Sequence, residues 1–199
     1  MKRIFLPLLV FFLVCACSQQ PATETLPGSV PEKEGVSSKG IHHFIEAVEQ
    51  SGQEWHSFML LRHGKMIAEG WWNPYRSDLK HTMYSVSKTF TSTATGFAVS
   101  EGKLTVDDRV VSFFPEQAPD TVSDHLAALR VKDLLCMAAG QNPEPFGIVR
   151  GQNWVKSFLS VPIVDEPGAK FLYNSIATYM LSAILQKVTG EKLIDYLVQ

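Results

Sequence analysis

Cysteine is scarce in this 199-residue sequence, and the positions of the cysteines limit which roles they can have. The only cysteines are Cys15, Cys17 and Cys136. The first two end an N-terminal stretch with a basic start and an apolar run over residues 4–14, which is typical of a secretory signal peptide. Cys136 lies in an apolar stretch that predicts a helix, where we expect a buried and unreactive thiol.

The residues around Cys17 resemble the cleavage site of bacterial lipoproteins. This resemblance implies a signal peptide over residues 1–17, a lipid on Cys17, and an exported protein held on a membrane of the bacterial cell envelope, facing the periplasm or the cell surface. Only Cys136 would then remain free, so no disulfide could form within the mature chain. The alternatives are an ordinary signal peptide cleaved nearby and a retained membrane anchor, for which the apolar run is short.

The sequence also lacks a strong charge imbalance and any spaced set of metal ligands. It has 18 basic and 20 acidic residues, a formal net charge of −2, and no basic patch of the kind that binds nucleic acid. His42 and His43 are adjacent, so on a helix they point in different directions. We therefore expect no nucleic-acid partner, no metal site and no cofactor.

The pattern along the chain indicates a tether followed by one folded part. Residues 18–38 are rich in Pro, Ser, Thr and Glu, which predicts a flexible segment. Apolar periodicity and stop signals predict a β-hairpin at 55–72 and helices at 41–48, 85–100, 129–140, 176–189 and 191–199. Because an isolated hairpin is marginally stable, we interpret residues 39–199 as the N-terminal part of a larger domain.

The pattern Ser-x-x-Lys occurs three times, and only its surroundings distinguish the copies. Ser100 to Lys103 spans a helix-ending glycine, and Ser77 to Lys80 lies in a polar stretch that reads as a loop. Ser85 stands at the start of the helix predicted for 85–100. Unpaired backbone N–H groups and the positive end of the helix dipole would favour a developing oxyanion there.

Lys88 is the only formally charged residue between Thr82 and Ser100, and it lies on the same helical face as Ser85. Such a helix is expected to be buried on several sides, through an apolar stripe at Val86, Phe90, Ala94, Phe97 and Ala98. Burial lowers the pKa of a lysine and makes its neutral amine available as a base for the serine hydroxyl. The alternative is that Ser85 caps the helix while Lys88 extends to solvent.

A second group of polar residues, Tyr173, Asn174 and Ser175, precedes the helix predicted for 176–189. A phenol at the end of an extended segment can project into a cleft. Asn and Ser are also the preferred residues for capping a helix, and the tyrosine could equally be a half-buried aromatic. The residues by themselves do not decide between a role in a cleft and these structural roles.

Ser85-Val86-Ser87-Lys88 together with Tyr173-Asn174-Ser175 resembles the first two motifs of the serine β-lactamase and penicillin-binding superfamily. The similarity covers about residues 41–199 and is closest to the branch with class C β-lactamases, D-amino-acid peptidases, esterases of this fold and 6-aminohexanoate oligomer hydrolases. It implies an α/β (α+β) fold with an antiparallel sheet flanked by helices, of the β-lactamase and transpeptidase type and incomplete in this chain.

The resemblance also implies catalytic roles. Ser85 would be the nucleophile of an acyl-enzyme, Lys88 its activator, and Tyr173 the group that passes the proton to the leaving group. Ser175 and Asn174 would bind substrate. The implied function is hydrolysis of an amide, ester or peptide bond in a small-molecule, peptide or ester substrate.

Two departures from the family pattern qualify this function. Class C enzymes have Tyr-x-Asn, whereas Ser175 fills the third place here, which favours the peptidase or esterase relatives over antibiotic hydrolysis. The third motif, Lys-Thr-Gly or His-x-Gly on a strand, is absent, so this chain is expected to hold half a site. The alternative function is a non-catalytic envelope lipoprotein of the same fold that binds peptidoglycan peptides or a protein partner.

Overall fold

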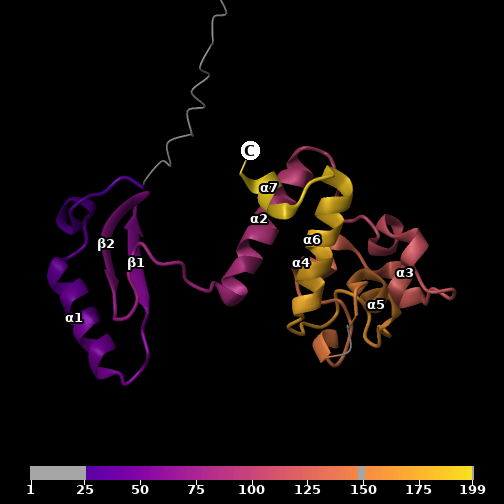
Figure 1. Cartoon of the computed structure of the whole chain (residues 1–199), viewed down its shortest axis with the longest axis horizontal. Helices are drawn as coiled ribbons and strands as arrows, with labels where there is room; N and C mark the ends of the chain where they lie inside the picture. The colour runs from indigo at the N-terminus through magenta and orange to yellow at the C-terminus, as the bar shows by residue number, and fades with distance from the viewer. Residues whose placement is uncertain (1–25, 148–150, 199) are drawn as a thin grey trace, which may run out of the picture. The chain divides into compact units, whose positions relative to one another are not determined.

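The structure is a computed structural model that describes residues 26–147 and 151–198 (Figure 1). The predicted leader and Cys17 therefore lie outside the described residues. The chain divides into two compact units, Met1–His81 and Thr82–Gln199. Among the described residues, no helix is both long enough and apolar enough to cross a membrane.

The first unit consists of a short 3-10 helix, one α-helix and a β-hairpin. These elements are η1 (Pro31–Glu34), α1 (Ser38–Gln50), β1 (Ser57–Arg62) and β2 (Lys65–Trp71). The two strands pair antiparallel, and the turn residues His63 and Gly64 both have positive φ, as a tight two-residue hairpin requires. The apolar side of α1 faces the hairpin, with the rings of Phe44 and Phe58 5.6 Å apart. The predicted helix and hairpin are thus present.

We expected a flexible tether over residues 18–38, but its described part, residues 26–38, is structured. Backbone N–H groups of Ser29 and Met66 pair this segment with β2, and η1 follows directly. Glu34 is only 7% exposed and bonds to Ser29, His63 and Lys65. A charged residue in a Pro- and Glu-rich stretch gives no sign of burial by itself, because its partners His63 and Lys65 lie about thirty residues later. The folded part therefore begins before residue 39.

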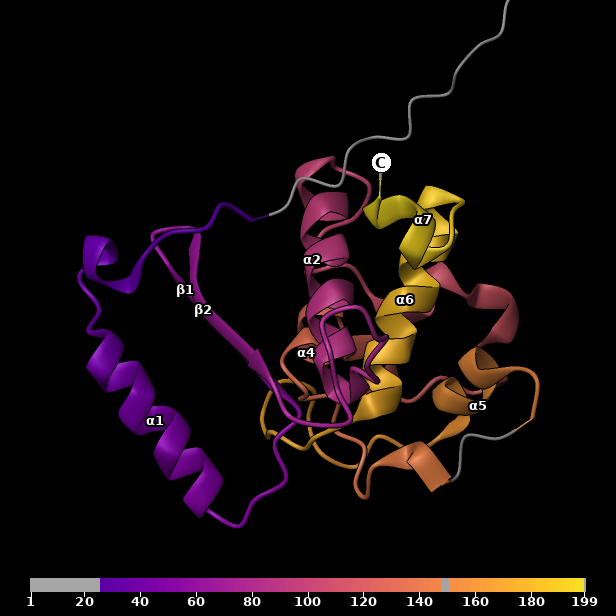
Figure 2. The ribbon, with the colours of Figure 1, turned by 60° about the vertical axis from the view of Figure 1, so that its left-hand side comes forward.

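The second unit is helical and contains the main hydrophobic core. Its helices of five or more residues are α2 (Ser87–Ser100), α3 (Asp124–Ala128), α4 (Val131–Leu135), α5 (Trp154–Ser160), α6 (Ser175–Thr189) and α7 (Leu193–Leu197). Helix α6 packs against both α2 and α4 (Figure 2). Its buried stripe includes Ile176, Met180 and Ile184, and Gly190 ends it in a left-handed conformation, as the sequence predicts.

Three local predictions for this unit are wrong. Helix α4 ends at Leu135, and Cys136 after it is exposed rather than buried. Helix α2 buries Thr91, Ala94, Thr95 and Ala98, whereas Phe90 and Phe97 from the expected stripe are about half exposed. With almost no charged residues in α2, its sequence does not distinguish the face packed on α6 from the opposite face.

Candidate active site

Ser85 lies in the 3-10 turn η2 (Tyr84–Val86), directly before α2. The long helix begins at Ser87, two residues later than the sequence predicts. Tyr84 has φ of +45°, which is uncommon for any residue other than glycine. The hydroxyl of Ser87 donates a hydrogen bond of 2.6 Å to the Tyr84 carbonyl oxygen. This bond holds the unusual turn that carries Ser85.

Ser85, Lys88 and Tyr173 lie together, although the tyrosine is 88 residues away from the serine along the chain. The Lys88 amine donates to Ser85 Oγ at 3.1 Å, and Ser85 Oγ lies 2.6 Å from the Tyr173 hydroxyl. The Lys88 Nζ atom also lies 5.0 Å from the centre of the Tyr173 ring. Ser85 Oγ therefore has two polar neighbours within hydrogen-bond distance, an amine and a phenol.

The polar groups around Tyr173 change the pKa of its phenol. The amine of Lys88, and after it the hydroxyl of Ser85, hold the pKa of Tyr173 below its usual range, while partial burial opposes them. The Ser175 side chain adds a smaller effect in the same direction. The Tyr173 side chain is 43% exposed and Lys88 is partly buried, so solvent reaches the group. The phenol of Tyr173 therefore ionises at a lower pH than that of a free tyrosine.

Asn174 and Ser175, both predicted to bind substrate, have different surroundings. Asn174 is 1% exposed, and its side chain caps α6 by accepting from the Ala177 N–H. Its amide nitrogen donates to Gln141 Oε1 at 3.0 Å. Both ends of the side chain therefore have partners within the protein, and its contact with substrate stays a prediction. Ser175 is partly exposed beside Tyr173, and its contact with substrate stays a prediction.

Sequence reasoning missed two residues near this turn. Gln141 is 2% exposed and receives the Asn174 bond, while Glu144 accepts from the Ser175 backbone N–H. The available signal was a polar glutamine directly after the apolar run that ends at Gly140. Buried polar side chains are nearly always hydrogen-bonded, so such a glutamine requires partners elsewhere in the chain.

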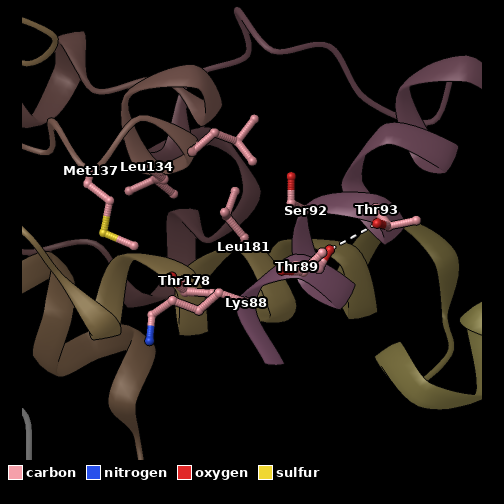
Figure 3. Close-up of a pocket in the computed structure, with 9 residues that line it drawn as sticks. Lys88, Thr89, Ser92, Thr93, Leu134, Met137, Thr178 and Leu181 are labelled. Carbon is pink, nitrogen blue, oxygen red and sulfur yellow. Dashed lines mark hydrogen bonds between the residues drawn. The ribbon is translucent and has the colours of Figure 1, made fainter. Parts of the chain in front are cut away.

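A cavity of about 310 Å³ lies beside Lys88 between α2, α6 and the end of α4 (Figure 3). Besides Lys88, four lining residues bear hydroxyls and four are apolar: Thr89, Ser92, Thr93 and Thr178, and Leu134, Leu135, Met137 and Leu181. Lys88 is its one lining residue that carries a formal charge. Within residues 26–147 and 151–198, no group of three or more His, Cys, Asp or Glu could hold a metal ion.

The chain is similar in sequence to known proteins. The chain is 23% identical to the "Putative D-alanyl-D-alanine carboxypeptidase" of Escherichia coli strain K12, over 98% of this chain and 52% of the relative. It is 27% identical to the 6-aminohexanoate-dimer hydrolase of Paenarthrobacter ureafaciens, over 71% of this chain and 40% of that protein. It thus spans about half the length of the curated relatives that it matches.

The fold of this chain is also similar to the folds of solved structures. The structure of FmtA from Staphylococcus aureus matches with a TM-score of 0.61 at 17% identity, over 89% of this chain and 50% of that chain. The sequence model described as Beta-lactamase matches residues 44–199, which include the Ser85, Lys88 and Tyr173 cluster. This match extends over most of the sequence and over both structural units. The chain therefore belongs to the Beta-lactamase family.

Proposed function

We propose that this protein is a serine hydrolase that forms an acyl-enzyme on Ser85. The observation that carries the proposal is the position of Ser85 Oγ, 3.1 Å from the Lys88 amine and 2.6 Å from the Tyr173 hydroxyl. A serine hydroxyl is a weak nucleophile until a neighbouring base accepts its proton. Membership of a family whose matched relatives include hydrolases supports the same general activity.

In the proposed reaction, Ser85 Oγ attacks the acyl carbon while its proton passes to the Lys88 and Tyr173 pair. Tyr173 then delivers a proton to the leaving group as the bond from the acyl carbon breaks. Water attacks the resulting ester, and the proton that it loses restores the serine hydroxyl. The backbone N–H of Ser85 is our candidate for one oxyanion donor.

Amides, esters and peptides are the proposed substrate class. Relatives are named for a 6-aminohexanoate dimer and for N-acetylmuramyl-L-alanine, both of which contain amide bonds. The cavity beside Lys88, whose lining contains both hydroxyl-bearing and apolar side chains, fits a substrate of mixed polarity. The export and the lipid on Cys17 stay proposals from the sequence.

The test is labelling of the full-length protein with p-nitrophenyl acetate, followed by mass measurement of the intact protein and its peptides. We expect one acetyl group on Ser85 and none after Ser85→Ala. Ser100→Ala is the matched control, because Ser100 is an exposed serine at the end of α2, the helix that follows Ser85, and its hydroxyl bonds to the Phe97 carbonyl oxygen. It should label as the unsubstituted protein does.

Two results would contradict the proposal. Label that persists at the same peptide after Ser85→Ala would show that another residue reacts. Binding of peptidoglycan peptides that survives Ser85→Ala, without labelling or turnover in either protein, would favour the non-catalytic envelope protein.

A further inference from the structure

The turn that carries Tyr173 is held by a buried pair of amide side chains, Asn174 and Gln141. The Asn174 amide nitrogen donates to Gln141 Oε1 at 3.0 Å, and the Gln141 amide nitrogen donates to the Phe158 carbonyl oxygen at 3.1 Å. The two side chains are 1% and 2% exposed. Asn174 Oδ1 also accepts from the Ala177 N–H at 2.9 Å. The pair thus connects the start of α6 to α5 through the interior.

The backbone on both sides of Tyr173 is fixed to the same neighbouring segment. The Leu172 N–H donates to the Met137 carbonyl oxygen at 2.8 Å, and the Asn174 N–H donates to Met137 Sδ at 3.1 Å. Gly140 has φ of +76°, and a side chain there would overlap the Asp165 carbonyl oxygen. This glycine sets the path by which the next residue, Gln141, enters the core.

We propose that Gln141 is a positioning residue that acts through Asn174 to hold the Tyr173 hydroxyl at Ser85. The inference rests on the proposed acyl-enzyme function and adds to it. Tyr173 itself is 43% exposed, so its orientation depends on the buried side of its own turn. Misplacing a catalytic group by about 1 Å can cost about 10²-fold in rate.

Glutamine suits this position because its amide both accepts and donates. Leucine would leave the buried Asn174 amide nitrogen without its Gln141 partner, which is costly in a low-dielectric interior. The Phe158 carbonyl oxygen would lose one of its two donors and keep the Val161 N–H. Glutamate can do both only while it is protonated. Once ionised, it would place a carboxylate against the Phe158 carbonyl oxygen.

The experiment measures acylation of the full-length protein by p-nitrophenyl acetate as a function of ester concentration, which separates the maximal rate from the half-saturating concentration. Gln141→Leu should lower the maximal rate by about tenfold or more, with little change in half-saturation. The same substitution in a Tyr173→Phe protein should cause no further loss, because the hydroxyl that Gln141 positions is gone. For Gln141→Glu, the rate should fall as the pH rises through the pKa of the new carboxyl.

Val110→Ala is the control for lost stability, since Val110 is fully buried in the same core and lies outside this hydrogen-bond network. It should lower the denaturation midpoint and leave the maximal rate unchanged. Equal losses from Gln141→Leu with and without the Tyr173 hydroxyl would overturn the positioning role while leaving the proposed function standing. An unsubstituted protein that is not acylated on Ser85 would overturn both.

Discussion

Tyr173 is the residue whose surroundings most directly link structure to proton transfer. Its hydroxyl lies 2.6 Å from Ser85 Oγ, and the Lys88 amine beside it lowers its pKa. A lower pKa increases the fraction of phenolate at any given pH. Because a phenolate can accept the serine proton, the rate of acylation should depend on the ionisation of this one group.

We therefore predict that acylation rises with pH along a limb whose midpoint lies below the ordinary tyrosine value of about 10. Tyr173→Phe should remove that limb and slow acylation by about 10²-fold to 10⁴-fold, the usual contribution of a positioned acid or base. The measurement is the rate of p-nitrophenol release between pH 6 and 11, read by stopped-flow absorbance.

Tyr179→Phe is the matched control for this prediction. Tyr179 lies on α6, and its ring packs edge-on against Trp154 with the centroids 5.1 Å apart. Its pH profile should match that of the unsubstituted protein. A Tyr173→Phe protein that kept the limb would assign the titration to another group and exclude Tyr173 as the proton acceptor.

Between elements, Glu34 connects η1 to the hairpin of the first unit. Its carboxylate accepts from Lys65 at 2.7 Å and from Ser29 at 2.7 Å, and it lies 3.1 Å from His63 Nδ1. These hydrogen bonds, that of Lys65 first, lower the pKa of Glu34 from 4.5 to about 2. The proton therefore binds the unfolded chain more tightly than the folded one.

The lowered pKa of Glu34 makes its contribution to the free energy of unfolding depend on pH. Ionised Glu34 stabilises the folded state fully above a pH of about 4.5, and this contribution is lost as the pH falls towards 2. We predict that Glu34→Gln lowers the free energy of unfolding at pH 7 and that its difference from the unsubstituted protein shrinks between pH 5 and 2. Urea denaturation followed by circular dichroism at several pH values measures this.

Glu49→Gln provides the comparison, because Glu49 is an exposed carboxylate on α1 of the same unit. It should change the unfolding free energy little at any of these pH values. A Glu34→Gln difference that stayed constant down to pH 2 would show that the carboxylate charge does not contribute.

For the whole molecule, the two units differ in how much core each contains. Among the described residues, the buried apolar side chains of the first unit are Val48 and Ile67. The large cluster of buried apolar residues lies between Ala94 and Tyr196, entirely within the second unit. A two-stranded hairpin with one helix gains little burial, whereas helices packed around a continuous core can fold cooperatively.

We predict that a fragment of residues 82–199 retains helical circular dichroism and unfolds in a single transition, while a fragment of residues 26–81 does not fold alone. Thermal and urea unfolding of both fragments beside the full chain tests this. A cooperative transition in the 26–81 fragment, or none in the 82–199 fragment, would contradict this division of stability.

Much of the fold follows from local sequence patterns. The hairpin around His63 and Gly64 and the helix that ends at Gly190 are both present as predicted, because alternation, periodicity and stop residues act within a few positions. The predictions for the described part of the tether, for the burial of Cys136 and for the buried face of α2 differ from the structure. Each of these depends on which distant segment packs against the residue, and sequence periodicity does not contain that information.

The candidate site likewise has some features that local sequence determines and others that depend on tertiary contacts. The sequence by itself determined that Ser85 and Lys88, three residues apart where a long helix begins, can reach each other, and that Asn174 can cap another helix, because three-residue spacing and capping are local geometry. Only the tertiary structure decided that Tyr173 meets Ser85 across 88 residues and that Gln141 is buried against Asn174. The packing of α6 onto α2 and α4 brings these segments together, and the need to satisfy buried polar groups fixes them there.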